Sequence, residues 1–286
     1  MRGRRGPLSF ELPIGSTKEQ LRLERGKLTR ALADALRLAF TQLPSSPSEA
    51  VHWHPHIPGD PDVWFDSAEP QTINNPKYGS RRVRLIKKFP GYARIIPSKW
   101  SANSTAKNSL AAGETISAIL RRSSSIIFGR SQGGTMACAV GGVEDGIDQS
   151  YALTQWFETT GEFWGIGGSF LFERVCVSLA SASIYWLWLD FLAHNCKLAL
   201  SLGGSLPIHV RLGVHDLRNS WWPRPDYGFL DEGFAAVEQS YEYLATIDSI
   251  NAEVLQENVV KAFNGLADAY GIPGFTHDQI VALSRR

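Results

Sequence analysis

The feature that most constrains the fold is a succession of short apolar or alternating segments between residues 81 and 168. These segments are RRVRLI, ARIIP, SSIIFGR, TMACAVGG, SYALTQWFE and GEFWGIGGSF. Most are separated by glycines and acidic turns, and the turns VEDGID and TTGE each supply a glycine where a hairpin connection favours positive φ. Such a series predicts antiparallel strands joined by short hairpins, rather than parallel strands with helical crossovers.

Apolar periodicity predicts helices and further strands in the second half of the chain. Residues 171–202 are predicted to form a long buried helix that ends at Gly203 and Gly204. The run PIHVRLGVH alternates and predicts a strand, residues 236–247 alternate again, and Asn251–Tyr270 predicts an amphipathic helix. The expected fold class is therefore α+β: an antiparallel strand meander with a long packed helix.

The N-terminal third differs in composition from this domain. Residues 16–43 predict a basic amphipathic helix, and seven prolines between residues 44 and 80 predict a linker or an irregular loop. We therefore expect an N-terminal helix over 1–45, a Pro-rich linker or loop over 46–80 and an α+β domain over 81–286.

Cysteine count and apolar run lengths bear on the compartment. The chain has three cysteines and no C-x-x-C pair, which disfavours a disulfide framework and a zinc ribbon. The charge-free run between Arg174 and Asp190 holds only 15 residues, too few to span a bilayer. No apolar segment typical of a signal peptide follows the basic N-terminus. These patterns predict a cytoplasmic location without membrane association.

The charges are balanced overall, with 29 Lys and Arg against 28 Asp and Glu, but they are unevenly distributed. No acidic residue lies between Glu69 and Glu114, whereas nine basic residues and several aromatic residues do. Basic residues bind phosphates and aromatic rings stack on unpaired bases, so this segment predicts a DNA or RNA contact. The candidate residues are Arg81, Arg82, Arg84, Lys87, Lys88, Tyr92 and Arg94. The alternative is a solvated strand face whose charges pair with the acidic C-terminal half.

Histidines offer an alternative chemistry. His52, His54 and His56 alternate, and Asp60 and Asp62 follow, so a metal-dependent hydrolase is one interpretation of this segment. The other interpretation is surface histidines in a Pro-rich loop, because no further ligand stands at a metal-motif spacing. His215 and Asp216 could belong to a catalytic triad, but the sequence has no G-x-S-x-G motif that would supply the serine nucleophile. We therefore expect no cofactor and no bound metal, and favour a non-catalytic protein.

Two adjacent indoles predict a partner surface. Trp221 and Trp222 lie in the loop-like run WWPRP, and exposed aromatic side chains mark interfaces with a protein partner or a second copy of the chain. A further alternative is an effector-binding sensor domain with a pocket between the strands and the long helix.

The runs YARIIPSKW, FGRSQGGTMACAVGGVEDG and SYALTQWFETTGEFWGIGG occur in an order that resembles bacterial Schlafen/AlbA-type DNA-binding proteins. The resemblance covers about residues 81–275 and concerns the region that follows the AlbA domain of those proteins. The AlbA portion itself is not recognisable in residues 1–80. The resemblance implies a non-catalytic regulatory or interaction module, which we expect to contact nucleic acid through segment 77–107.

Overall fold

The structure is a computed structural model of the 286-residue chain. The chain divides into two compact units, Met1–Ala50 and Val51–Arg286, and every residue described below belongs to the second. The structure describes residues 53, 70–85, 91–101, 113–114, 116, 120, 125–131, 133–167, 171–173, 177–179, 181–215, 217–218, 220–222 and 233–283. The predicted helix 1–45 lies outside these residues.

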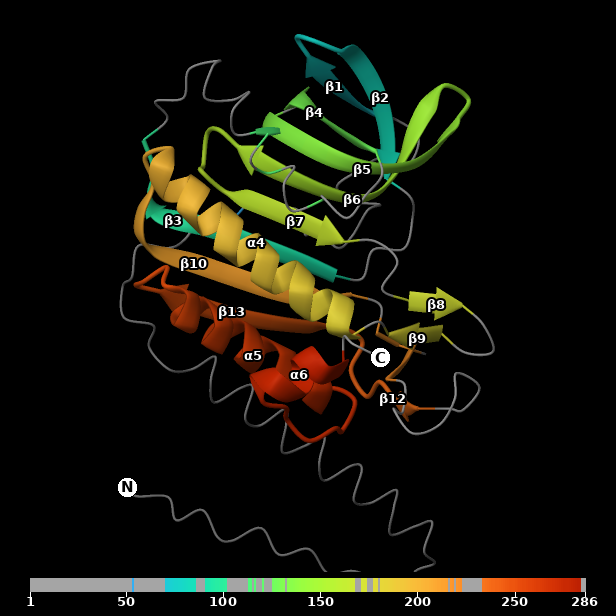
Figure 1. Cartoon of the computed structure of the whole chain (residues 1–286), viewed down its shortest axis with the longest axis vertical. Coiled ribbons are helices and arrows are strands. Elements are labelled where there is room, and N and C mark those ends of the chain that lie inside the picture. Colours follow the sequence, from blue (N-terminus) through green and yellow to red (C-terminus); the bar gives the residue numbers. More distant parts are fainter. Residues whose placement is uncertain are drawn as a thin grey trace, which may run out of the picture. The chain divides into compact units, whose positions relative to one another are not determined.

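Five strands close into a small barrel at the top of Figure 1. They are β1 (Gln71–Asn75), β2 (Gly79–Leu85), β4 (Ile126–Ser131), β5 (Gly134–Glu144) and β6 (Ile147–Phe157). The ring closes because β6 bonds both to β5 and, in parallel, to β2, while β1 bonds to β2 and β4. Its apolar residues form a separate core cluster made of Ile73, Val83, Met136, Cys138 and Leu153, together with Ile166 of the neighbouring strand.

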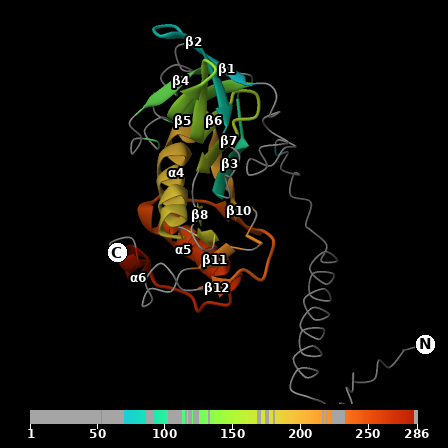
Figure 2. The ribbon, with the colours of Figure 1, turned by 90° about the vertical axis from the view of Figure 1, so that its right-hand side faces the viewer.

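The second half of β6 continues into an open antiparallel sheet. This sheet adds β7 (Phe163–Gly167), β3 (Gly91–Lys99), β10 (Ser205–Val214) and β13 (Tyr241–Ile247), in that order from β6. The helices α4 (Ser181–Ser201) and α5 (Ala252–Asp268) lie together on one face of these strands, followed by α6 (His277–Leu283), as Figures 1 and 2 show. The fold class predicted from the sequence is confirmed.

The alternation of β10 positions the main core. Ile208, Val210, Leu212 and Val214 are all buried in the cluster that includes the inner face of α4. Phe191 of α4 lies against Gly165 of β7, and Trp188 Nε1 donates to the Tyr92 carbonyl oxygen at 2.9 Å. The opposite side chains of β3 and β10 therefore point to the other face of the sheet.

The helix ends follow the sequence signals. The N–H groups of Gly203 and Gly204 donate to carbonyls of the last turn of α4, at 3.2 and 2.9 Å. The side chain of Asn251 caps α5 by accepting from Val254 N at 2.8 Å. The predicted turn VEDGID is also confirmed, since Asp145 and Gly146 both have positive φ, 51° and 73°.

Two predicted boundaries are wrong. The long helix begins at Ser181 instead of 171, because residues before it form β8 (Leu171–Glu173) and β9 (Val177–Leu179). These strands belong to a small second sheet with β11 (Ser220–Trp222) and β12 (Phe234–Ala235). The sheet of the α+β domain begins at Gln71 instead of 81, so the end of the predicted linker 46–80 is a strand. Its sequence, QTINN, is short and polar, and backbone pairing with β2 is what makes it a strand.

Within the described helices, none has the length and apolar character needed to cross a membrane. Cys138 and Cys196 are buried free thiols, and burial raises the pKa of each to about 12.

Candidate functional site

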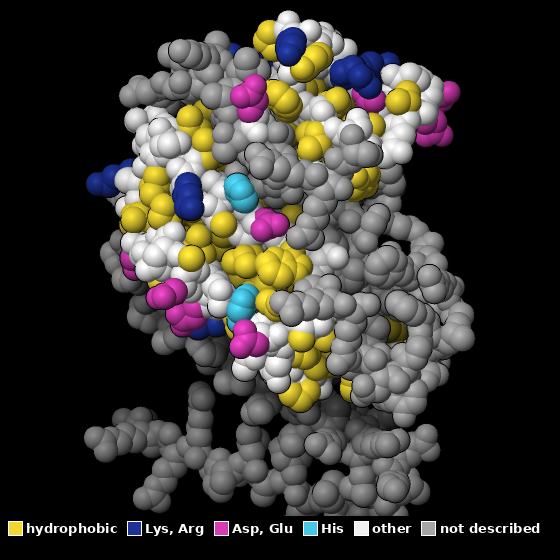
Figure 3. Space-filling model, viewed as in Figure 1, with side chains coloured by type: hydrophobic (Ala, Val, Ile, Leu, Met, Phe, Trp, Pro, Cys, Tyr) yellow, Lys and Arg dark blue, Asp and Glu magenta, His cyan; other side chains and the backbone are white. Residues whose placement is uncertain are grey.

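The β1–β2 hairpin projects basic and aromatic side chains into solvent, two from its turn and one from β2. Lys77, Tyr78 and Arg82 are exposed, and we call these three residues the hairpin surface. Tyr78 is 67% exposed, and the Lys77 ammonium lies 5.1 Å from the centre of its ring. Figure 3 shows basic side chains at the top of the molecule, over the β1–β2 hairpin.

Asn75 holds this turn in place. Its Oδ1 accepts from the backbone N–H groups of Lys77 and Tyr78, at 2.8 and 3.2 Å. Its Nδ2 donates to the carbonyl oxygen of Phe128 at 2.8 Å, which ties the hairpin to β4. The amide therefore uses its donor and acceptor groups in fixing the position of Tyr78 relative to β4.

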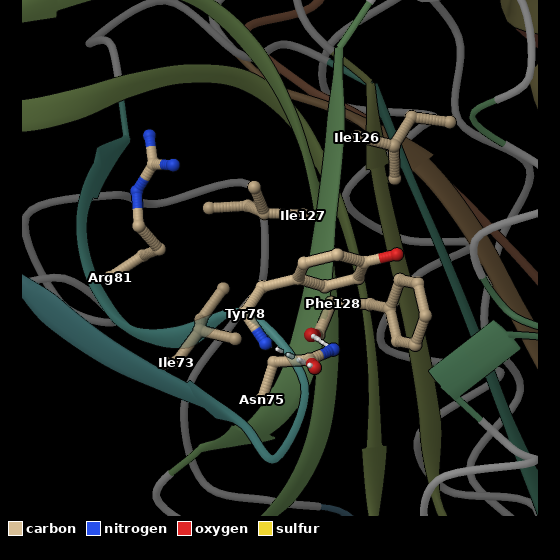
Figure 4. Close-up of a pocket in the computed structure, with 8 residues that line it drawn as sticks. Ile73, Asn75, Tyr78, Arg81, Ile126, Ile127 and Phe128 are labelled. Carbon is tan, nitrogen blue, oxygen red and sulfur yellow. Dashed lines mark hydrogen bonds between the residues drawn. The ribbon is translucent and has the colours of Figure 1, made fainter.

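A cavity of about 230 Å³ lies between the hairpin and β4. Figure 4 shows Tyr78 beside Phe128, with Asn75 below them and Arg81 on the far side of the cavity. The remaining lining comes from Ile73, Gly79, Ile126 and Ile127. The cavity is thus mainly apolar, with a guanidinium and a phenol at its margin.

Arg81 has a structural partner. Its Nε donates to Asp148 Oδ2 at 2.8 Å, and a second guanidinium nitrogen bonds to Oδ1. The Asp148 side chain is only 2% exposed, whereas that of Arg81 is 49% exposed. The bond to Asp148, and next the carboxylate charge itself, raise the pKa of Arg81 above its ordinary value. Arg81 therefore neutralises a buried carboxylate of β6.

The residues predicted to contact nucleic acid differ in their exposure to solvent. Arg82 is exposed and Arg84 is partly buried, while Lys87 and Lys88 lie outside the described residues. Tyr92 and Arg94 are 1% and 2% exposed, so the prediction that they form part of a surface nucleic-acid contact is wrong. Seven consecutive residues of β3, Gly91–Pro97, are buried, because both faces of this strand are covered.

Arg94 belongs to a buried ion pair on the face of the sheet opposite α4. Its Nε and Nη2 both lie 2.7 Å from Glu162 Oε1, and Trp164 Nε1 donates to the same oxygen. Burial lowers the pKa of Arg94, the ion pair with Glu162 opposes this, and the charge of Arg211 lowers it further. A second arginine therefore lies close to the buried one.

Arg211 of β10 is the residue directly opposite Arg94 in the sheet. The indole of Trp53 lies against both guanidinium groups, with 4.7 Å from its ring centre to Arg211 Cζ and 5.0 Å to Arg94 Cζ. We call Arg94, Arg211 and Trp53 the arginine pair with its indole. One sequence signal points to Arg211: it alternates with the apolar residues of HVRLGV and therefore faces away from α4.

Tyr92 connects this group to the edge strand. Gly213, its direct neighbour on β10, has no side chain, so the Tyr92 ring extends over it, and a Cβ there would overlap the ring. The Tyr92 hydroxyl donates to Glu242 Oε2 of β13 at 2.6 Å. Burial, and then the charge of Glu242, raise the pKa of Tyr92 far above its ordinary value. The ring of His215 stacks on that of Tyr92, with 5.1 Å between ring centres.

The predicted partner surface at Trp222 is wrong. Trp222 is 4% exposed and lies among Phe263, Tyr270 and Phe275, with ring centres 5.4 to 5.9 Å away. Trp221 is partly buried and pairs with Ala235 of β12.

The predicted histidine cluster is not placed by the structure. His52, His54 and His56, with Asp60 and Asp62, lie outside the described residues, as does Asp216. Within the part of the chain that the structure describes, no three His, Cys, Asp or Glu side chains come together as a metal site would require. The cavity beside the β1–β2 hairpin does not lie between the strands and the long helix, and the predicted pocket there stays a prediction.

The described part of the chain thus combines a five-stranded barrel with a sheet covered by helices on one face. No family model matches this chain, and comparisons with curated proteins and with solved structures gave no match. The function is therefore argued from the geometry of the site.

Proposed function

We propose that this protein is a non-catalytic binding module that contacts single-stranded nucleic acid through its hairpin surface. The observation that carries the proposal is the position of Tyr78: a tyrosine 67% exposed at a fixed turn, between a lysine and an apolar cavity. The resemblance to DNA-binding proteins indicates the same class of partner.

An exposed tyrosine on a fixed turn suits base stacking. Every base has a flat face, so stacking on an aromatic ring tolerates any sequence and contributes about 1–3 kcal/mol per base. Because Asn75 bonds to the N–H of Tyr78 and to the carbonyl of Phe128, little backbone freedom is lost when a base binds. The apolar lining of the adjacent cavity, with Ile127 and Phe128, offers a second contact for the same base.

The exposed basic residues of the hairpin suit a phosphate backbone. Lys77 and Arg82 are exposed, and each releases counterions from a phosphate that it neutralises. Arg81 is not counted among the phosphate contacts, because its guanidinium is paired with Asp148. The hairpin surface therefore contributes two basic side chains and one stacking platform.

The test is binding of the full chain to a fluorescent single-stranded oligonucleotide, compared with the same sequence as a duplex. Tyr78→Ala is expected to weaken single-strand binding by about 1–3 kcal/mol, the contribution of one stacked base. Arg82→Ala is expected to reduce the slope of log K against log salt by about 0.7, the value for one phosphate contact on a single strand.

Lys197→Ala is the matched control, since Lys197 is exposed on α4, away from the hairpin. It removes one positive charge and should leave both the affinity and the salt slope unchanged. If Tyr78→Ala and Arg82→Ala bind as tightly as the unaltered chain, the hairpin surface is not the binding site. Tighter binding of the duplex would contradict the assignment to single strands.

A further inference from the structure

Arg81 lines the cavity beside Tyr78 and has hydrogen-bond donors that its structural role does not use. A guanidinium carries five N–H groups, and two of those in Arg81, on Nε and Nη2, donate to Asp148. The second N–H of Nη2 and one N–H of Nη1 point in parallel from the other edge of the plane. We call these two donors the end fork. Arg81 makes no hydrogen bond through them in the part of the chain that the structure describes, and its side chain is 49% exposed.

Asp148 holds the end fork in a fixed orientation. Both of its carboxylate oxygens accept from Arg81, and its own side chain is 2% exposed. Because two bonds to one buried acceptor fix the guanidinium plane, little side-chain freedom is lost when the end fork binds a ligand. Asp148 compensates the positive charge, so the attraction of Arg81 for distant phosphates is weak, whereas hydrogen bonds of the end fork depend on direction. The end fork therefore suits an uncharged group with two neighbouring acceptors.

The cavity between Arg81 and Tyr78 suits a single flat ring system. Its volume is about 230 Å³, below the roughly 300–1,000 Å³ of pockets that hold drug-sized molecules. Figure 4 shows Tyr78 and Phe128 on one side, Arg81 on the other, and Ile127 between them in this view. A ligand in this cavity contacts apolar side chains with its faces, and the guanidinium at the margin is left for its edge.

We infer that the end fork of Arg81 donates to the edge of the base that stacks on Tyr78, and that it selects guanine at this one position. The inference rests on the nucleic-acid function proposed above. Guanine has two neighbouring acceptors, O6 and N7, and an arginine fork donates to both. Adenine places an amino group beside N7, and thymine places an N–H beside each carbonyl oxygen, so neither offers two adjacent acceptors. Cytosine has them in N3 and O2, but its single ring spans less of the cavity between Tyr78 and Arg81 than the two rings of guanine do.

The experiment measures binding of the full chain to fluorescent thymidine single strands that carry one test base at the centre. Guanine should bind about five- to 150-fold more tightly than thymine, the discrimination that one bidentate arginine–base pair supplies. Adenine and cytosine should bind more weakly than guanine by a similar factor. The salt concentration is the same for every strand, so the phosphate contribution is constant.

Two altered bases test the acceptors of guanine directly, without a change to the protein. Hypoxanthine keeps O6 and N7 and lacks only the 2-amino group, so it should bind as guanine does. 7-Deazaguanine has a C–H group in place of N7 and should bind about two- to twelvefold more weakly than guanine, the effect of one lost hydrogen bond.

Protein variants assign the preference to the end fork. Arg81→Lys keeps a positive charge beside Asp148 without the parallel donors, so it should lose the preference for guanine and bind the all-thymine strand as before. Arg130→Lys is the matched control. Arg130 is also an exposed arginine paired with a carboxylate, that of Glu158, but it does not line the cavity. This control should keep the full preference for guanine.

A paired substitution covers the case in which Arg81→Lys does not fold. Arg81→Gln combined with Asp148→Asn removes both charges together, so no buried carboxylate is left without its partner. The double variant should also lose the preference for guanine. If neither variant folds, the affinity of the unaltered chain for the 7-deazaguanine strand decides.

Failure of this inference differs from failure of the proposed function. The inference is overturned by equal affinity for guanine and thymine, by cytosine that binds as tightly as guanine, by undiminished binding of 7-deazaguanine, or by a preference that survives in Arg81→Lys. In each of these cases the proposed function stands if Tyr78→Ala weakens binding of every strand. Absence of binding to any single strand overturns both.

Discussion

Arginines on strands differ in solvent exposure between two regions of this molecule. On β2, Arg82 projects from a hairpin into solvent. On β3, Arg94 is 2% exposed, with Glu162 and Trp164 around its guanidinium. The two residues are twelve positions apart and belong to one basic segment of the sequence. What separates them is the number of strands and side chains that cover each one, so a run of basic residues is not by itself a basic surface.

The largest expected effect is on the free energy of unfolding, and it compares a carboxylate paired with a buried arginine with one paired with an exposed arginine. Glu162→Gln removes the carboxylate charge that is hydrogen-bonded to the buried guanidinium of Arg94 and should lower the free energy of unfolding by about 3–5 kcal/mol. Glu158→Gln breaks the exposed pair with Arg130, 2.9 Å long, and should lower it by about 0.2–1 kcal/mol. Urea unfolding of both variants measures the difference. Equal losses would mean that burial does not distinguish the two pairs.

A backbone change beneath the Tyr92 ring should have a smaller effect. Gly213→Ala places a Cβ where the Tyr92 ring lies, so the ring must move and its bond to Glu242 must lengthen. Overpacking of this kind costs about 1–3 kcal/mol, measured as a lower urea midpoint with an unchanged m value. Gly142→Ala is the control, because a Cβ at position 142 meets no atom within 4 Å. A loss in the control as large as that in Gly213→Ala would point to a general backbone effect.

The smallest expected effect is a pH dependence of the folding stability, caused by His209 of β10. His209 accepts from or donates to Thr246 Oγ1 at 3.1 Å, and burial lowers its pKa below the ordinary value. The unfolded chain therefore binds a proton at higher pH than the folded chain does, and stability falls as pH decreases below about 6.5. His209→Gln should flatten the stability profile between pH 7 and pH 5. An unchanged profile in this variant would assign the pH dependence to other groups.

Local sequence predicted the elements whose signals are short-range. The alternation of Ile208, Val210 and Leu212 predicted a strand with one buried face, and Gly203 and Asn251 marked helix ends because capping depends on neighbouring residues. The polar strand β1 was missed for the complementary reason. The segment QTINN has only one apolar residue, Ile73, and ends in two asparagines, so it shows no strand-like alternation of its own, and pairing with β2 determines its conformation.

The environment of a buried polar residue depends on residues far away in the sequence. Glu162 lies 68 positions from Arg94, and Glu242 lies 150 positions from Tyr92. Contacts over such separations leave no periodic pattern in the sequence. The local segment GYARIIP therefore could not show that Tyr92 and Arg94 are buried, and both were predicted to lie on the surface. Trp222 was misassigned for the same reason. The rings that pack against it, those of Phe263, Tyr270 and Phe275, follow β13 in the sequence and lie about 40 to 50 positions away.

The two-sided bonding of β6 has a consequence for dissecting the molecule. Residues 148–150 of this strand bond to β2 of the barrel, and residues 152–156 bond to β7 of the open sheet. A cut that removes the barrel takes away the strand on which β7 is aligned, and a cut that removes the sheet leaves half of β6 with an unpaired edge. The shortest fragment that retains either region therefore retains both, and truncation is a poor substitute for point substitution in separating their roles.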